Sequence, residues 1–381
     1  MRRVYLDWNA TTPPLETVVD AMREAARQSW GNPSSVHAFG REALARVEDA
    51  RAAVAALVQC DPRDVVLTSG ATEANNLAIR GAFASPHTAA GVLVTSRLEH
   101  PSVTRVAEAL ERELRARVRW VKVGSDGTID LADLERALEA PGVRLMAVQA
   151  VNQETGAVQP LTEVVELARR SSVLLHVDAV QSFGRLENVA EEAATRSLAA
   201  HKMRGPKGIG ALIHRPGAPL APVLVGGSQE RGLRPGTVDP VAAAGLAVAA
   251  RHALTTPARW SGLASLRGAL EAGILRLAPS ARINAAMAQR APHVASVAFP
   301  GWAGPELVAA LDLEGVAASS GSACSAGTAE PSATLLAMGD VEAARSTVRF
   351  SLGEDTTSED IDVALAALAR IVRRVGGPPP Q

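Results

Sequence analysis

The chain has 381 residues, of which 47% are hydrophobic and 21% charged, and its formal net charge is −1. This length is enough for two or three domains with a large buried core. The near-zero net charge excludes a general electrostatic footprint for nucleic acid or anionic membrane, and the longest apolar stretch, residues 241–250, is too short to span a bilayer.

The two cysteines, Cys60 and Cys324, lie far apart in the sequence. Met1 is followed by two arginines and then by mixed residues, without the apolar run of a secretory signal. We therefore expect a cytoplasmic protein with reduced thiols and no disulfide. Cys60 ends a helical pattern and is expected to be structural.

Apolar runs alternate with helical patterns along most of the chain. Apolar residues at helical spacing after Pro13-Pro14 predict a first helix near residue 15. Strand-like runs then alternate with helical stretches such as 101–114 and 161–170. This alternation predicts an α/β fold with a mostly parallel sheet covered on both faces. The predicted strands are 64–69, 92–96, 118–123, 145–151, 173–178 and 209–214.

The pattern changes after about residue 250. A long helical stretch precedes a strand-like run at 294–299, a Gly/Ser/Ala-rich loop and a final helix capped near Thr357. We predict a large domain over residues 15–250 and a smaller α+β domain formed by 1–14 and 251–381. The smaller domain would carry a mobile loop with Cys324 at about 319–332.

A lysine and an acid mark the centre of the chain. Asp178 ends an apolar strand, and Lys202 lies in a short turn after it. A pyridoxal phosphate (PLP) enzyme needs such a pair, because the amine forms a Schiff base with the cofactor aldehyde and the acid keeps the ring nitrogen protonated. Ligands of parallel sheets bind beyond the carboxyl ends of the strands, where Asp178 would lie. Alone, a lysine in a glycine-rich loop is more often a solvated surface residue.

Other motifs also allow both a functional and a structural interpretation. Ser69-Gly70-Ala71-Thr72-Glu73 joins a strand to a helix and suits either a phosphate or a plain threonine-capped turn. The loop 232–237 is open to the same two interpretations. His100 is either an acid/base group or a solvated loop residue.

Two motifs in the last third suit a reaction with a small amino acid. Cys324 lies among small residues in the loop 319–327, either as a nucleophile on a mobile arm or as a buried cysteine in a tight turn. Arg349, in an alternating strand, would clamp a carboxylate bidentately or be an ordinary strand-edge arginine.

Together, in this order and spacing, the motifs resemble those of the cysteine desulfurases, PLP enzymes of the class V aminotransferase superfamily with fold type I. The resemblance runs nearly end to end and implies a seven-stranded sheet in the large domain. The motifs that carry it are Tyr5-Leu6-Asp7, Asn9-Ala10-Thr11-Thr12, Gly31-Asn32-Pro33-Ser34-Ser35-Val36-His37, Ser69-Gly70-Ala71-Thr72-Glu73, Glu99-His100, His176-Val177-Asp178-Ala179-Val180-Gln181, His201-Lys202, Gly205-Pro206-Lys207-Gly208 and Ser319-Ser320-Gly321-Ser322-Ala323-Cys324.

The resemblance implies how PLP is held. Lys202 would carry it and move the substrate's α-proton, Asp178 would pair with its ring nitrogen, and Gln181 would bond its phenolic oxygen. His100 would stack on the ring and act as acid/base toward the substrate thiol. The remaining residues implied to contact the cofactor are Ala71, Thr72, Gln153, His201 and, from the neighbouring subunit of a homodimer, Thr237.

The resemblance also implies the reaction. Arg349, with Asn32, would bind L-cysteine, and Cys324 would take its sulfur as a persulfide and leave L-alanine. The sulfur would pass to an acceptor protein for iron–sulfur cluster assembly or thiolation. No resident metal is implied, although Cys324 is a candidate transient cluster ligand.

Four positions depart from the family pattern. Ala199 and Ala200 replace a serine and a glycine before the His-Lys pair, Gln153 replaces an asparagine, and Ser228 replaces a glycine. A lost phosphate hydroxyl weakens PLP binding by roughly 1 kcal/mol. Two alternatives stay open: another PLP-dependent C–S or C–Se lyase or small amino-acid aminotransferase of the same fold, and a non-catalytic subunit of a sulfur-transfer assembly.

Overall fold

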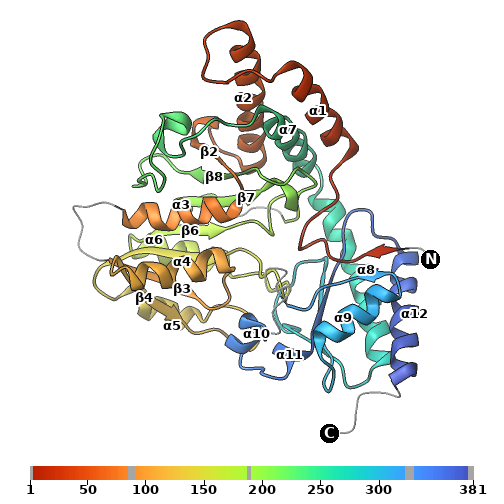
Figure 1. The fold of residues 1–381 in the computed structure, drawn as a ribbon. Coiled ribbons are helices and arrows are strands. Elements are labelled where there is room, and N and C mark those ends of the chain that lie inside the picture. The colour runs from red at the N-terminus through yellow and green to blue at the C-terminus, as the bar shows by residue number, and fades with distance from the viewer. Residues whose placement is uncertain (1–2, 85–90, 187–189, 322–329, 376–381) are drawn as a thin grey trace.

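A seven-stranded sheet forms the centre of the larger part of the molecule (Figure 1). The computed structural model describes residues 3–84, 91–186, 190–321 and 330–375. In spatial order the strands are β2 (Val65–Thr68), β8 (Gly210–His214), β7 (Thr195–Ala199), β6 (Leu174–Asp178), β5 (Val143–Gln149), β3 (Gly91–Ser96) and β4 (Ala116–Val121). Within the sheet β8 pairs antiparallel with both neighbours and all other pairs are parallel.

The predicted α/β fold is confirmed, and the six predicted strands all occur within two residues of their predicted ends. The sequence analysis missed β7 as a separate run. Its interior holds Arg196 and Ser197, both buried, so it lacks the apolar run that signals a buried strand. Arg196 donates to the Val58 carbonyl at 3.0 Å and lies over the Phe183 ring, which makes its burial tolerable.

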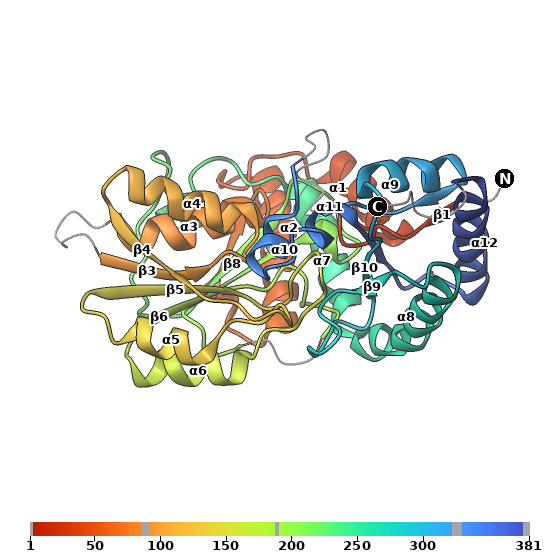
Figure 2. The ribbon, with the colours of Figure 1, turned by 90° about the horizontal axis from the view of Figure 1, so that it is seen from below.

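Helices cover both faces of this sheet (Figure 2). Alternate strand residues point to opposite faces, so each strand contributes to two cores. One face carries α3 (Ala71–Phe83) and α4 (Pro101–Arg112). The other carries α2 (Ala38–Val58), α5 (Leu131–Leu138), α6 (Leu161–Arg170) and α7 (Pro240–Leu254), with α1 (Glu16–Gln28) packed on α7.

A second core lies in the smaller part of the molecule. It joins Leu6 and Trp8 of the N-terminal segment to residues of the C-terminal third. The N-terminal segment is joined to the C-terminal third because β1 (Val4–Tyr5) pairs parallel with β11 (Val316–Ala317). Short helices α10 (Ala333–Ala337) and α11 (Ala343–Ser346) lie near the larger part (Figure 1). The other elements are α8 (Pro257–Leu277), β9 (Arg282–Ile283), β10 (Val294–Ala298), α9 (Gly304–Leu313), β12 (Thr347–Ser351) and α12 (Ser358–Val375).

The predicted domain boundary at residue 250 falls in the last turn of α7, and the division itself stays a prediction. In the part of the chain that the structure describes, every helix is too short or too polar to cross a membrane.

Candidate active site

A cavity of about 380 Å³ lies at the carboxyl end of the sheet, where the parallel strands β5 and β6 stop. Its volume is in the range of small-molecule sites. It is formed by the ends of these strands, the starts of α3 and α4, the turn around Lys202 and the N-terminal segment. The predicted residues that line it are Ala71, Thr72, His100, Gln153, Asp178, Gln181, His201, Lys202 and Arg349.

The start of α3 forms one wall of the cavity. Gly70 immediately precedes the helix with φ +147°, a conformation that side chains disfavour, and a Cβ added there would meet open space. A Cβ on Gly210 of β8 would lie 2.8 Å from the Gly70 Cα, so a glycine is needed for this close approach. Ala71 and Thr72 thus bring the unpaired N–H groups of a helix N-terminus to the cavity, as an anion site requires.

His201 and Lys207 line the same cavity. His201 Nδ1 lies 3.1 Å from the Thr11 hydroxyl. Burial, with Lys202 and Lys207 adding repulsion, lowers the pKa of His201 to about 4, so the ring is neutral near pH 7. Lys207 is a cation that the sequence analysis quoted within a motif without giving it a role.

Asp178 is buried at the end of β6 and held by two donors. Its Oδ1 accepts from the Val180 N–H at 3.1 Å, and its Oδ2 accepts from Asn75 Nδ2 at 2.8 Å. Two fixed donors orient the carboxylate at the cavity wall. Burial lowers the pKa of neighbouring His176 to about 4, so that ring is neutral as well.

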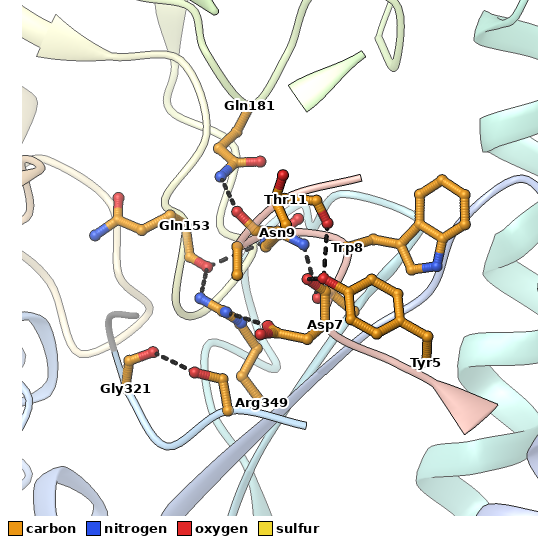
Figure 3. A network of polar contacts seen from close by, with 12 residues as sticks. Tyr5, Asp7, Trp8, Asn9, Thr11, Gln153, Gln181, Gly321 and Arg349 are labelled. Atoms are coloured by element: carbon orange, nitrogen blue, oxygen red, sulfur yellow. Dashed lines mark hydrogen bonds and ion pairs between the residues drawn. The ribbon is translucent and has the colours of Figure 1, made fainter. Parts of the chain in front are cut away.

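The N-terminal segment holds the Lys202 amine. Lys202 Nζ donates to the Ala10 carbonyl at 2.9 Å and also to the Asn9 carbonyl. Gln181 Nε2 donates to the same Asn9 carbonyl at 3.1 Å (Figure 3). Hydrogen bonds to two carbonyl groups therefore hold the amine against the cavity wall.

Arg349 reaches the cavity from β12 with its guanidinium already paired. Its Nη2 donates to Asp7 Oδ1 at 2.7 Å and its Nη1 to the Gln153 carbonyl at 2.9 Å (Figure 3). Its buried Nε has no hydrogen-bond partner among the described residues. The Tyr5 hydroxyl donates to the carbonyls of Asp7 and Thr11, and burial together with the Asp7 charge raises the pKa of Tyr5 to about 12.

A buried arginine lies behind this wall. Arg185 is 1% exposed and donates to the Lys202 carbonyl at 2.7 Å, to Asn9 Oδ1 at 3.0 Å and to Gln181 Oε1. Its guanidinium also lies 4.7 Å from the centre of the Trp260 ring. Arg185 thereby connects three residues of the cavity wall.

Of the predicted site residues, two do not line the cavity and one lies outside the residues that the structure describes. Thr237 and Asn32 are exposed and do not line the cavity of their own chain. Cys324 lies outside the described residues, although the loop that leads to it starts beside Arg349: the backbone of Ser319 exchanges hydrogen bonds with Arg349 at 3.1 and 2.7 Å.

Sequence reasoning missed four polar residues around the cavity: Asn75, Ser102, Gln149 and Arg185. Ser102 and Gln149 line it, and the buried Gln149 Oε1 has no partner among the described residues. Asn75 and Arg185 support it from behind. The position of Ser102, two residues after His100 at a helix start, was the one available signal.

The arrangement fits PLP. The start of α3, with His201 and Lys207, would hold a phosphate, Asp178 would hold the ring nitrogen, and Lys202 offers the amine. The orphaned Gln149 Oε1 and Arg349 Nε are buried polar atoms that call for a ligand in this cavity. Fold and site together define the class of PLP-dependent enzymes of fold type I.

Comparison with known proteins identifies the family. The model of the aminotransferase class-V family matches residues 4–364, so the chain belongs to this family, whose cofactor is PLP. It is 40% identical to a cysteine desulfurase of Cereibacter sphaeroides, over 98% of this chain and 96% of that one. It is 35% identical to the cysteine desulfurase IscS of Dictyoglomus turgidum, over 98% and 95%.

Solved structures give the same relationship. A NifS-like protein superposes with a TM-score of 0.90 at 31% identity, covering 98% of this chain and 100% of that one. A structure described as SspA in complex with cysteine superposes with a TM-score of 0.81 at 32% identity, covering 93% and 100%.

Proposed function

We propose that this protein is a PLP-dependent L-cysteine desulfurase. The observation that carries the proposal is the cavity itself, which brings the Lys202 amine, the Asp178 carboxylate, the start of α3 and the Arg349 guanidinium together from four separate parts of the chain. The relatives are cysteine desulfurases and SspA forms a complex with cysteine, which favours L-cysteine as the substrate.

The residues divide the work by position. When bound, PLP supplies an electron sink for the substrate's α-carbon. Arg349 binds the substrate carboxylate, and Asp7 and the Gln153 carbonyl fix its orientation. Lys202 moves the α-proton, since its side chain lines the cavity and its amine is held there by the carbonyls of Asn9 and Ala10.

The sulfur leaves on Cys324. Its thiolate attacks the sulfur of the bound cysteine, the Cβ–S bond breaks with its electron pair going to carbon, and a proton completes L-alanine. The sulfur remains on Cys324 as a persulfide for an acceptor protein. Support comes from the loop's origin beside Arg349, the proposed carboxylate site.

We also propose a homodimer in which Thr237 reaches the phosphate of the neighbouring subunit. Thr237 is exposed in a loop that Arg234 ties to the start of α3 through Glu73, at 2.9 Å. Large apolar side chains that a monomer would leave in water support an interface: Trp30 is 64%, Phe39 52% and Val225 100% exposed. Trp30 and Phe39 stack with ring centres 5.1 Å apart.

We propose a cytoplasmic location from the sequence alone. A cytoplasmic protein agrees with the bacterial relatives, whereas a relative of Saccharomyces cerevisiae, 37% identical over 98% of this chain and 75% of that one, is named as mitochondrial. The acceptor protein for the sulfur is a prediction from the family resemblance.

The test is the release of alanine and sulfide from L-cysteine under reductant, measured for the PLP-loaded protein, Cys324→Ala and the matched control Cys60→Ala. We expect turnover to be lost in Cys324→Ala with its PLP absorbance intact, and to be kept in Cys60→Ala. Turnover retained in Cys324→Ala would overturn the persulfide step and favour a lyase. A protein that binds PLP but releases neither product would overturn the desulfurase.

A further inference from the structure

A line of hydrogen bonds joins Asp178 to His100 through Asn75 and Ser102, two residues that the proposed reaction does not use. Asn75 Nδ2 donates to Asp178 Oδ2 and to Ser102 Oγ, each at 2.8 Å. Ser102 Oγ lies 2.8 Å from His100 Nδ1. Asn75 and Ser102 are 0% and 7% exposed, so the line is shielded from water.

The direction of each hydrogen bond follows from its neighbours. A carboxylate only accepts, so the Asn75 amide must turn its NH₂ toward Asp178 and its oxygen away. That oxygen lies 2.9 Å from His176 Nε2, which therefore carries the proton. His176 Nδ1 then accepts from the Thr195 hydroxyl at 2.9 Å. Thr195 and His176 thus lock the amide in one orientation.

The same argument determines which nitrogen of His100 carries the proton. Asn75 donates to Ser102 Oγ, and the Ser102 backbone N–H makes His100 Nδ1 an acceptor, so the single hydroxyl proton of Ser102 is directed at that nitrogen. The Ser102 backbone N–H donates to the same Nδ1 at 3.1 Å, because His100 is the N-cap of α4. Two donors converge on Nδ1, so this nitrogen is an acceptor and the ring proton resides on Nε2.

We infer that Asn75 and Ser102 are positioning residues that hold His100 as the Nε2–H tautomer and couple it to Asp178. In this form His100 presents a hydrogen-bond donor, not a base, to the substrate. Uptake of a proton would have to occur at Nδ1, where the Ser102 hydroxyl would turn away and the backbone N–H would face another N–H. His100 is thereby restricted to donating toward the substrate or the cofactor ring.

The charges around His100 act on its titration as well. Burial lowers the pKa of His100, the charge of Lys202 lowers it further, and Asp178 opposes both. Removal of the Ser102 hydroxyl would take away a donor that stabilises the neutral ring, so the pKa of His100 would rise. The inference that His100 faces PLP rests on the proposed function, but the tautomer depends only on this chain's residues.

The test is a long-range ¹H–¹⁵N spectrum of the PLP-loaded protein with ¹⁵N-labelled histidine, in which His100→Gln assigns the signal. We expect the Nε2–H pattern for His100 in the unmodified protein. In Ser102→Ala we expect its titration midpoint to rise by roughly half a pH unit to one unit, the equivalent of one hydrogen bond. Ser102→Thr, which keeps a hydroxyl, should restore the midpoint.

Ser346→Ala is the matched control, because Ser346 is also a buried serine with one hydroxyl bond, 2.9 Å to the Glu342 carbonyl across the short helix α11. It should leave the His100 titration unchanged. An Nδ1–H signal in the unmodified protein would overturn the inference without any variant. An unmoved midpoint in a folded Ser102→Ala would overturn the role of Ser102. Neither result depends on turnover, so loss of the proposed desulfurase activity would be a separate finding.

Discussion

Replacing Arg185 by methionine removes the donor that connects three residues of the cavity wall. The carbonyl of Lys202 and Oε1 of Gln181 lose this partner, and the Trp8 carbonyl loses only a long contact of 3.4 Å. Asn9 Oδ1 keeps a contact with His293 at 2.9 Å. A buried acceptor left unpaired costs about 1–3 kcal/mol, so two cost about 2–6 kcal/mol. The variant also no longer buries a cation that, in its described hydrogen bonds, contacts no carboxylate, and this offsets part of the cost. We therefore expect the free energy of unfolding to fall by about 3 kcal/mol.

Thermal unfolding measures the loss. With an unfolding entropy of about 2.1 cal/mol/K per residue, a protein of 381 residues melts roughly 4 °C lower for 3 kcal/mol. The protein and PLP concentrations must be equal in all samples, because bound PLP stabilises the fold. A PLP titration followed by absorbance gives the Kd of PLP. We expect the Kd of PLP to rise about tenfold, which corresponds to about 1.4 kcal/mol lost in positioning Lys202 and Gln181.

Arg196→Met is the control for burial alone. Arg196 is 3% exposed and lies outside the cavity, so its variant should melt lower and bind PLP with an unchanged Kd. Arg185→Met with the melting temperature and Kd of the unmodified protein would refute the reasoning. A lower melting temperature with an unchanged Kd would show that Arg185 supports the fold without positioning the cavity wall.

Two further predictions concern titration at the edge of the site and at the remote cysteine. The chain has one tyrosine, so phenolate absorbance reports Tyr5 alone, and we expect a midpoint of about 12. The midpoint should fall in Asp7→Asn, because the Asp7 charge raises the pKa of Tyr5; an unchanged midpoint would contradict this effect of the charge. The folded pKa of Tyr5 exceeds the ordinary 10.0, so its stabilisation is complete below pH 10 and is lost as pH rises toward 12, which denaturation across that window would show. Burial raises the pKa of the Cys60 thiol to about 11, so alkylation of Cys324→Ala should be slow at neutral pH and accelerate toward pH 11; rapid labelling at neutral pH would contradict this.

The strands that the sequence predicted each contain several apolar side chains, in a run or at alternate positions. β7 was not predicted because a buried arginine and a buried serine interrupt its apolar pattern. The partners of the arginine, Val58 and Phe183, lie too far along the chain to be recognised from the neighbouring sequence. The family motifs pointed to Lys202 and Asp178, and both line the cavity; their roles stay predictions. The line through Asn75 and Ser102 could not be predicted, because its contacts join residues 27 and 103 positions apart.

The N-terminal segment explains why the cavity requires both cores. Its Trp8 packs in the small core, where a Cβ on Gly353 would lie 1.7 Å from the ring and only glycine fits. The next residue, Asn9, receives donors from Lys202, Gln181 and Arg185, which belong to the large sheet's side of the site. Asp7, one residue before Trp8, fixes Arg349 of the small core. The turn from Asp7 to Ala10, closed by a 3.0 Å hydrogen bond from the Ala10 N–H to the Asp7 carbonyl, therefore connects the amine to the carboxylate site, and a shift of the small core against the sheet would change the separation between them.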